Sequence, residues 1–263
     1  MKIDFYKYHG NGNDFVIVDN RFGRILFNNS QIAFLCDRHF GIGADGLMLL
    51  EAHNTFDFSL KYYNSDGNES TMCGNGGRCM TAFANELGII DKQARFIAVD
   101  GEHEAEILAK NSKQYIVKLK MKDTRPGQTF EDGYFIDTGS PHFVKFVPSV
   151  DEIDVVKLGR ALRHESRFEN GGCNVNFVEL TQSGLRVRTY ERGVENETLS
   201  CGTGVTASAV ITALLNQDNK GCYSVNTTGG EFKVHFRRSG QEFTEVYLEG
   251  PAVFVYKGEI LIN

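Results

Sequence analysis

The chain has 263 residues, of which 41% are hydrophobic and 24% are charged, and its formal net charge is −6. These proportions are typical of an ordinary globular protein, and no apolar run approaches the ~20 residues that a membrane-spanning helix needs. The acidic net charge and the scattered basic residues disfavour nucleic acid as a partner. We therefore expect a small-molecule substrate and neither a nucleic-acid nor a membrane partner.

The local sequence predicts mostly strands, with a few helices between them. Runs of β-branched and aromatic residues bounded by Gly, Asn and Asp indicate strands, and longer apolar stretches indicate helices. In chain order, the predicted elements are strand 15–19, helix 31–38, strand 58–63, helix 76–87, strands 95–99, 115–121 and 143–147, helix 155–164, strands 175–180 and 185–190, helix 203–215, and strands 233–236 and 246–248. Gly88 and Asn216 stand where the C-terminal caps of the second and fourth helices belong.

The chain contains two copies of one pattern. Cys73 precedes Gly-Asn-Gly-Gly, and Cys201 precedes Gly-Thr-Gly-Val 128 residues later. The same offset relates further pairs in the two halves: Phe15 and Phe143, Ala33 and Ala161, Phe40 and Phe168, Glu51 and Glu179, and Gly101 and Gly229. Self-similarity at one offset predicts two copies of one structural unit, so we divide the chain into residues 1–123 and 124–263. Residues 252–263 are a surplus apolar strand without a counterpart, which can pack back on the first half.

A cysteine at a helix N-terminus is a candidate acid or base. The first N–H groups of a helix have no helical partner and carry a partial positive charge, which lowers the pKa of a nearby thiol and can hold a substrate carboxylate. Each half has one long apolar helix that starts just after its cysteine, so two such helices would place a thiol on either side of one substrate carbon. A base on one face and an acid on the other invert that carbon. The pair Cys73 and Cys201 therefore indicates two-thiol chemistry at one centre.

The other cysteines and the lysines suggest no cofactor. Cys36, Cys79, Cys173 and Cys222 are interpreted as small buried residues. The N-terminus lacks the uninterrupted apolar core of a signal peptide, so we expect free thiols in the cytoplasm. The close pair Cys36 and His39 has no second half with ligand spacing, so we expect no metal. No lysine has the glycine-framed setting of a pyridoxal phosphate Schiff base, so we expect no organic cofactor.

Several short motifs follow one another in a fixed order along the chain. They are His9-Gly10-Asn11-Gly12-Asn13-Asp14-Phe15, Asn64-Ser65-Asp66-Gly67, Cys73-Gly74-Asn75-Gly76-Gly77-Arg78, Ser140-Pro141-His142, Glu191-Arg192-Gly193 and Cys201-Gly202-Thr203-Gly204. Together they resemble the diaminopimelate epimerase family over essentially the whole length. The resemblance implies an α+β fold of two pseudo-symmetric domains, each a mostly antiparallel curled sheet around a central helix, with the active site in the cleft between them. It also implies a cofactor-independent enzyme that interconverts LL- and meso-2,6-diaminopimelate in the synthesis of lysine and peptidoglycan precursors, and it is compatible with a homodimer.

The resemblance also assigns roles to single residues. It makes Cys73 and Cys201 the catalytic acid/base pair, whose roles exchange with reaction direction, and it makes His142 and Glu191 the ionisable neighbours of the thiols. The backbone N–H groups that would hold the reacting carboxylate are those of Gly74, Asn75, Gly202 and Thr203. The residues that would recognise the substrate's ammonium and carboxylate groups are Asn13, Asn64, Asn174, Glu191 and Arg192. A guanidinium suits a distal carboxylate and a carboxylate suits an ammonium. A structural role for His142, and turn roles for the three asparagines, stay open.

The chain departs from the family pattern at three places, and two alternative functions stay open. Ser140 stands where many members have an asparagine, Gly46 stands where some have a glutamine, and residues 194–197 make one loop longer, which we expect to bulge outward. Proline or hydroxyproline racemases share the fold, but their first motif carries histidine where this chain has Asn75. A non-enzymatic binding protein of the same fold would need neither thiol.

Overall fold

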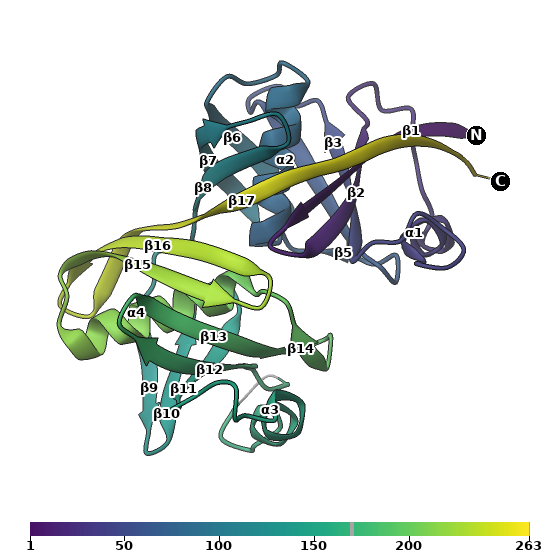
Figure 1. Ribbon diagram of the computed structural model, residues 1–263. Coiled ribbons are helices and arrows are strands. Elements are labelled where there is room, and N and C mark those ends of the chain that lie inside the picture. The colour runs from purple at the N-terminus through teal and green to yellow at the C-terminus, as the bar shows by residue number, and fades with distance from the viewer. Residues whose placement is uncertain (169–170, 263) are drawn as a thin grey trace. The chain divides into compact units, whose positions relative to one another are not determined.

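The computed structural model describes residues 1–168 and 171–262, which fold into two compact units (Figure 1). Unit 1 comprises Met1–Leu119 and the chain from Gly250 onward, and unit 2 comprises Lys120–Glu249. The chain thus leaves unit 1 at residue 119, rather than at the predicted 123, and returns to it at Gly250. None of the helices in the described residues has the length and apolar character that a membrane crossing requires.

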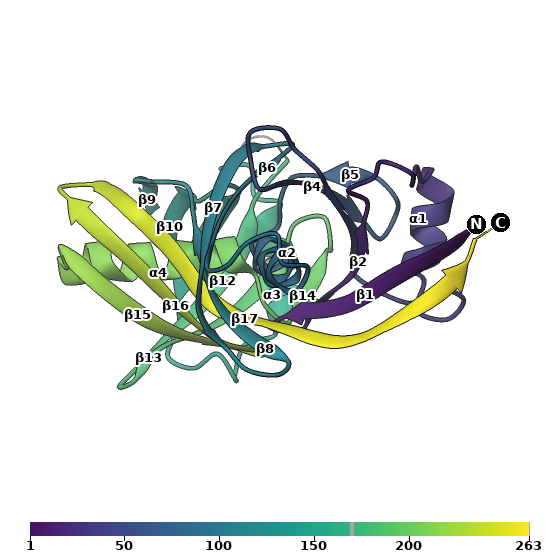
Figure 2. The same cartoon turned by 90° about the horizontal axis from the view of Figure 1, so that it is seen from above.

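In unit 1, a closed sheet surrounds helix α2 (Gly74–Glu86). Its strands are β1 (Lys2–Gly10), β2 (Asn13–Asp19), β3 (Gly46–Glu51), β4 (Phe58–Asn64), β6 (Gln93–Ala98), β7 (Gly101–Lys110), β8 (Gln114–Lys120) and the second part of β17 (Glu242–Leu261). β2 and β3 pair in parallel, as do β4 and β6, and the other neighbours are antiparallel. Because β17 pairs with both β8 and β1, the sheet closes. Figure 2 shows α2 end-on within these strands.

Two smaller elements complete unit 1. Helix α1 (Asn29–Cys36) starts with a capping box, in which Asn28 and Gln31 each bond the other's backbone N–H. The short strand β5 (Glu69–Ser70) pairs with β4 and leads to the start of α2. From Gly250 to its end at Leu261, β17 belongs to unit 1, and Asn263 lies outside the described residues.

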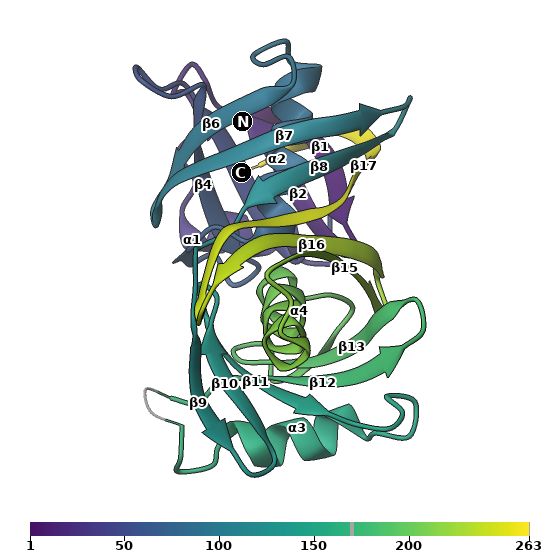
Figure 3. The same ribbon diagram turned by 90° about the vertical axis from the view of Figure 1, so that its left-hand side faces the viewer.

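Unit 2 repeats this arrangement around helix α4 (Gly202–Asn216). Its elements are β9 (Pro126–Phe130), β10 (Gly133–Asp137), β11 (Pro141–Phe146), helix α3 (Val155–Arg163), β12 (Asn174–Thr181), β13 (Gly184–Glu191), β14 (Asn196–Thr198), β15 (Lys220–Thr227), β16 (Gly230–Ser239) and the first part of β17. β11 and β12 are parallel, as are β13 and β15, at the places that correspond to the parallel pairs of unit 1. Figure 3 shows α4 end-on among these strands. The predicted α+β class, with two similar sheet-wrapped helices, is confirmed.

The four predicted helices are confirmed, and each central helix is buried on nearly every face. All residues from Gly74 to Ala84 are buried in α2, and the same holds for nearly all residues from Gly202 to Ala213 in α4. Gly88 has the left-handed φ of 69° expected of a helix cap. The cap predicted at Asn216 was wrong, because the left-handed residue is Gln217, with φ of 60°. The bonds from Gln217 and Asp218 to Leu214 and Ala213 require the turn there.

The prediction that the other four cysteines are buried is confirmed for three of them. Cys36, Cys79 and Cys173 are buried, and burial raises the pKa of each of these thiols to about 12. Cys222 is exposed, so its prediction as a buried residue was wrong. It lies on β15, where exposed and partly buried residues alternate from Lys220 to Tyr223, as the alternating faces of a strand explain.

Candidate active site

Cys73 is the N-cap residue of α2. Its backbone is extended, with φ −88° and ψ 133°, and its carbonyl accepts the first helical bond from Gly77 N–H over 2.7 Å. The N–H groups of residues 74–76 therefore belong to the first turn, where no helical carbonyl precedes them. This end of the helix favours a thiolate and a carboxylate.

The Cys73 side chain belongs to a group of amides. Its Sγ donates to Asn13 Oδ1 over 3.4 Å, and Asn75 Nδ2 donates to the same oxygen over 3.2 Å. Asn13 Nδ2 in turn donates to Asp45 Oδ2 over 2.7 Å. The orientation of the Asn13 amide is thus set by its partners, and its oxygen is directed toward the sulfur.

An ion-pair network holds the Asp45 carboxylate to which Asn13 donates. Arg38 bridges Asp14 and Asp45 at 2.7 and 2.8 Å, and the nearly buried Lys7 lies 2.7 Å from Asp14. Burial opposes ionisation of Asp14, but hydrogen bonds from Arg38 and Lys7 outweigh it and lower the pKa of Asp14 to about 2. Sequence reasoning missed this network, which depends on the parallel pairing of β2 with β3.

Asn64 and Gly46 lie opposite each other in the register of β4 and β3. The Asn64 side chain is exposed at the end of its strand. A Cβ atom added at Gly46 would lie 2.5 Å from Tyr62 Cε2 and 2.6 Å from the Tyr63 carbonyl oxygen. Tyr62 therefore fills the space in which a longer residue at position 46 would have to start.

Cys201 is the N-cap residue of α4, with φ −128° and ψ 108°. Its carbonyl accepts from Val205 N–H over 2.9 Å, the bond that corresponds to the one from Gly77 in unit 1. The two cysteines thus occupy equivalent places, as the duplicated motif predicts. Cys201 is 8% exposed.

The neighbours of Cys201 are hydroxyl groups and an imidazole, whereas those of Cys73 are amides. Thr203 Oγ1 lies 3.4 Å from Cys201 Sγ and 2.9 Å from His142 Nε2. Ser140 Oγ lies 3.0 Å from His142 Nε2 and 3.2 Å from Thr203 Oγ1. His142 is fully buried, and burial lowers its pKa to about 3. The ring is therefore neutral at physiological pH, and one hydroxyl separates it from the sulfur.

Asn176 holds His142 from the other side. Its Nδ2 lies 3.0 Å from His142 Nδ1 and donates to the Phe143 carbonyl over 3.3 Å. Its Oδ1 accepts from the Thr189 hydroxyl over 2.9 Å, which fixes the orientation of the amide. A Cβ atom at Gly204 would lie 2.2 Å from Asn176 Oδ1, so only glycine fits there. Sequence reasoning missed Asn176 and Thr189.

The remaining predicted residues of unit 2 lie around the end of β13. Asn174 Oδ1 accepts the Arg192 backbone N–H over 2.8 Å, and Asn174 Nδ2 donates to the Pro141 carbonyl over 3.1 Å. Arg192 Nη1 donates to the Gly172 carbonyl over 3.3 Å, and Glu191 accepts from the Thr198 hydroxyl over 3.0 Å. Arg192 and Glu191 are half-buried.

Of the segment predicted to bulge, Val194 and Glu195 lie in the turn of the β13–β14 hairpin, which Glu191 and Asn196 close, and Asn196 and Glu197 belong to β14. Glu195, with a left-handed φ of 58°, is bound there by Arg163 through two bonds of 2.8 and 2.9 Å. Its side chain also accepts from Gly193 N–H over 2.9 Å. The longer loop is therefore tied to helix α3.

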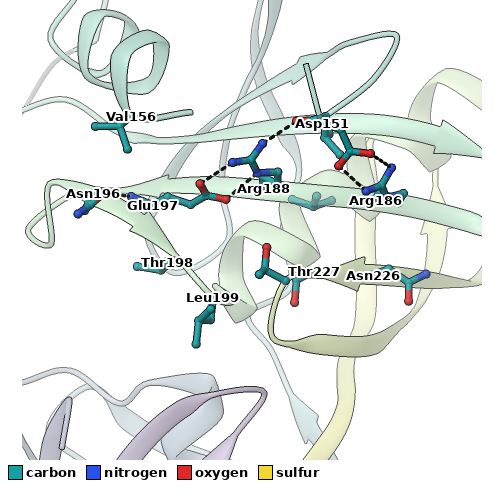
Figure 4. A pocket seen from close by; sticks show the side chains of 13 residues that line it. Asp151, Val156, Arg186, Arg188, Asn196, Glu197, Thr198, Leu199, Asn226 and Thr227 are labelled. Carbon is teal, nitrogen blue, oxygen red and sulfur yellow. Dashed lines mark hydrogen bonds and ion pairs between the residues drawn. The ribbon is translucent and has the colours of Figure 1, made fainter. Parts of the chain in front are cut away.

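A separate hollow of about 710 Å³ lies on unit 2, beside strands β13 and β14 (Figure 4). Its two arginines point toward carboxylates: Arg186 pairs with Asp151 at 2.7 Å and Arg188 pairs with Glu197 at 2.7 Å. These ion pairs balance the charge of its wall, and none of the predicted site residues lines it. At the N-termini of the two central helices, instead, Asn13 and Asn75 lie beside Cys73, and Thr203 and His142 lie beside Cys201.

Comparison with known proteins finds a family whose sequences are similar to this chain. The model of the family described as diaminopimelate epimerase matches residues 5–124 and 134–255. The diaminopimelate epimerase of Flavobacterium psychrophilum is 46% identical over 259 residues, which cover 97% of this chain and 99% of the relative. That of Chlorobaculum tepidum is 42% identical over 265 residues, covering 96% and 99%.

Solved structures with low sequence identity share the fold. A Bacillus anthracis phenazine biosynthesis protein of the PhzF family has a TM-score of 0.79 at 13% identity, with all of both chains covered. A hydroxyproline epimerase from Agrobacterium vitis has a TM-score of 0.72 at 15% identity, covering 98% of this chain and 92% of that one. At such identities the likeness concerns the fold alone.

Proposed function

The chain belongs to the diaminopimelate epimerase family, and on that premise we propose that it interconverts LL- and meso-2,6-diaminopimelate without a cofactor. The observation that carries the proposal is that each unit has a cysteine at the N-cap of its central helix. A thiol at this position can gain or lose a proton near neutral pH. The duplicated thiols match a reaction in which one proton leaves a carbon and another arrives from the opposite side.

In the proposed reaction, Cys73 and Cys201 share the work on the α-carbon. One acts as thiolate and takes the α-proton, and the electron pair of the broken C–H bond delocalises into the carboxylate. The other acts as thiol and gives its proton to the opposite face, so the centre inverts. The thiol and thiolate have then changed places, and the reverse reaction uses the same two residues.

The helix ends would bind the carboxylate next to the reacting carbon. The N–H groups of Gly74 and Asn75 in α2, and of Gly202 and Thr203 in α4, are in the first helical turns. They can stabilise the negative charge that grows on the carboxylate as the proton leaves. The proposed role of His142 is to hold the Thr203 hydroxyl beside Cys201, since the ring is neutral and lies one hydroxyl from the sulfur.

The distal amino-acid head group of the substrate would be recognised by polar side chains at strand ends: Asn13, Asn64, Asn174, Glu191 and Arg192. An arginine suits a carboxylate and a glutamate suits an ammonium. Asn174 supports this arrangement because it fixes the Arg192 backbone. We also propose that the enzyme serves lysine and peptidoglycan precursor synthesis in the cytoplasm, and a homodimer stays a prediction.

A substrate panel tests the proposal. Purified protein is incubated separately with LL-diaminopimelate, L-lysine, L-proline and trans-4-hydroxy-L-proline, and the stereoisomers are separated by chiral chromatography. We expect inversion of diaminopimelate, with turnover of lysine reduced at least a hundredfold because it leaves the distal charged groups unmatched. Inversion of proline or hydroxyproline at a comparable rate would favour the racemase alternative, and inversion of no substrate would favour a binding protein.

A further inference from the structure

We propose that Arg78 is a positioning residue for the Cys73 thiol, which fixes the amides beside the sulfur and supplies a buried positive charge to that end of helix α2. The inference rests on the proposed function, because it concerns one of the two proposed catalytic thiols. The duplicated pattern itself gives no role to Arg78.

Arg78 binds three segments of unit 1 together. Its side chain is fully buried, with 0% exposure. Nη2 donates to Asn11 Oδ1 over 3.0 Å and to Asn75 Oδ1 over 2.8 Å. Nη1 donates to the Gly74 carbonyl and Nε to the Pro251 carbonyl, each over 3.3 Å. One guanidinium thus connects the β1–β2 turn, the first turn of α2 and strand β17.

The turn that Arg78 holds is the one that presents Asn13. Asn11 and Gly12 both have left-handed backbones, with φ of 51° and 84°, as a tight Asn-Gly hairpin turn requires. The Asn11 side chain is 2% exposed. A Cβ atom at Gly10 would lie 3.1 Å from Arg78 Nη2 and 3.2 Å from Asn75 Cβ, so the strand end packs closely on the arginine.

The contacts form one oriented chain from a carboxylate to the guanidinium. Asp45 accepts from Asn13 Nδ2, Asn13 Oδ1 accepts from Asn75 Nδ2, and Asn75 Oδ1 accepts from Arg78. A reversed Asn75 amide would present its NH₂ group to the cation, so Arg78 dictates the orientation of Asn75. The orientation matters for the thiol, because the oxygen that Asn75 supports is the one to which Cys73 Sγ donates.

The charge of Arg78 acts on the same sulfur. Burial lowers the pKa of Arg78 to about 10, against the electrostatic effects of Cys79 and then Cys73, so the guanidinium remains charged at neutral pH. The attraction between opposite charges is strong where water is excluded. Removing the charge should therefore raise the pKa of the Cys73 thiol.

Unit 2 has a neutral residue at the equivalent position. The position that corresponds to Arg78 at the 128-residue offset is Thr206, whose hydroxyl donates to the Gly202 carbonyl over 2.9 Å. Both side chains thus bind the carbonyl of the first helical residue, but only the first copy adds a cation. The electrostatic interaction between Arg78 and Cys73 is therefore a feature of unit 1. Cys201 provides an internal reference for it.

Other ionisable groups near this end of α2 are present in the natural protein and in the Arg78 variants alike. They are His9, Asp45, Cys79, Asp100 and His103. Asp100 accepts the Met72 N–H over 3.3 Å and lies 3.2 Å from His103. Burial raises the pKa of Cys79 to about 12, although the charge of Arg78 acts to lower it, so the Cys79 thiol stays neutral at neutral pH. A difference in Cys73 between the natural protein and the variants therefore reports on Arg78.

The test measures alkylation of the full-length protein by iodoacetamide as a function of pH, with the labelling of Cys73 and of Cys201 quantified separately by peptide mass spectrometry. Arg78→Gln removes the charge, and Arg78→Lys keeps a charge but cannot reproduce the fork that reaches Asn11 and Asn75. Thr81→Val is the matched control, since Thr81 is another buried polar residue of α2, bonded to the Gly77 carbonyl.

We expect Arg78→Gln to raise the midpoint of Cys73 alkylation by about one pH unit, with the Cys201 midpoint unchanged. Arg78→Lys should keep the Cys73 midpoint and lower kcat at least tenfold, and Thr81→Val should change neither quantity. A folded Arg78→Gln protein with an unchanged Cys73 midpoint, or equal shifts at both thiols, would overturn the electrostatic role. If Arg78→Gln does not fold, Arg78→Lys decides, since unchanged kcat in that variant would overturn the positioning role. The midpoints require no substrate, so loss of the proposed function would leave this test intact.

Discussion

Asn176 donates its Nδ2–H to Nδ1 of His142 over 3.0 Å. The bonds of Asn176 to Thr189 and Phe143 fix which end of the amide faces the ring, so the neutral imidazole must carry its proton on Nε2. That proton points toward Ser140 and Thr203. When Thr203 Oγ1 accepts it, the Thr203 hydroxyl hydrogen is left to donate to the sulfur of Cys201. The tautomer thus supports the thiolate form of Cys201.

Replacing Asn176 by aspartate should reverse the tautomer. A carboxylate accepts a hydrogen bond from Nδ1, so Nε2 becomes an acceptor and draws the Thr203 hydroxyl hydrogen away from Cys201. We expect kcat to fall at least tenfold and nitrogen NMR of His142 to show the proton on Nδ1. Asn216→Asp, the same change at an exposed position, should keep natural kcat. An Asn176→Asp protein with natural kcat and the proton on Nε2 would contradict the proposed role.

His142 should make the protein less stable in acid. Burial lowers its pKa from 6.5 to about 3 in the folded state, so between these values the unfolded chain binds the additional proton. His142 alone should therefore lower the free energy of unfolding by about 1.4 kcal/mol for each pH unit below about 6. His142→Gln should flatten this dependence, measured by urea unfolding between pH 4 and 7. Parallel curves for the two proteins would contradict the assignment of a buried neutral ring.

Gly204 should tolerate no side chain. In Gly204→Ala, the added methyl would meet Asn176 Oδ1 at 2.2 Å and His142 Cε1 at 3.3 Å. We expect a loss of stability of about 1–3 kcal/mol and lower kcat, because Asn176 must shift. Gly221→Ala, whose methyl would have the Phe236 ring as its nearest neighbour at 3.0 Å, should cost less than about 1 kcal/mol and leave kcat unchanged. Equal effects of the two substitutions in thermal unfolding and in the assay would argue against this packing constraint.

Glu195 should stabilise the loop that carries Glu191 and Arg192. Hydrogen bonds from Arg163 and Gly193 lower the pKa of Glu195 to about 2 from its ordinary 4.5, so its stabilisation is present above about pH 4.5 and disappears as pH falls toward 2. We expect Glu195→Gln to cost about 1 kcal/mol at pH 7, since the pair is partly exposed, and to raise KM more than it lowers kcat. The cost should shrink at pH 3.

The matched control for that loop is Glu197→Gln, which breaks the ion pair with Arg188 on the neighbouring strand. It should lose comparable stability but keep the natural KM. A natural KM for Glu195→Gln, or a stability cost that does not change between pH 7 and pH 3, would contradict the proposed anchoring.

The sequence predicted the parts of the fold that local pattern determines. Helices α2 and α4 are apolar on most faces and follow a Cys-Gly turn, so their type and their starts were evident. Strand β1 was missed because Lys2, Asp4 and Lys7 interrupt it, although Lys7 is buried through its distant pairing with Asp14. Strand β7 was missed because it is rich in Glu and Ala, which favour helices, and its pairing with β6 and β8 overrides that preference.

The site was predictable only where a residue belongs to a motif. Cys73, Asn13 and Asn75 come from two motifs, and the structure joins them by hydrogen bonds. Asn176 and Thr189 escaped notice because their contact depends on the register of β12 and β13, in which they are direct partners. Long-range register of this kind is set by the packing of whole strands and leaves no local signal.

The central claim, that two thiols act on opposite faces of one carbon, is tested most directly by isotope transfer. LL-diaminopimelate is incubated with the natural protein in deuterated water, and the first few per cent of meso product and the remaining substrate are analysed by NMR and mass spectrometry. A thiol that has exchanged with solvent delivers deuterium, while the proton taken from the substrate stays on the other sulfur.

We expect the early meso product to carry deuterium at the inverted carbon and the recovered LL substrate to keep its proton. Cys73→Ala and Cys201→Ala should each reduce epimerisation by several orders of magnitude, and Cys222→Ala, which removes an exposed cysteine, should retain it. Product that keeps the substrate's own proton at the inverted carbon, or more than a few per cent of the natural rate in either single variant of Cys73 or Cys201, would contradict the account.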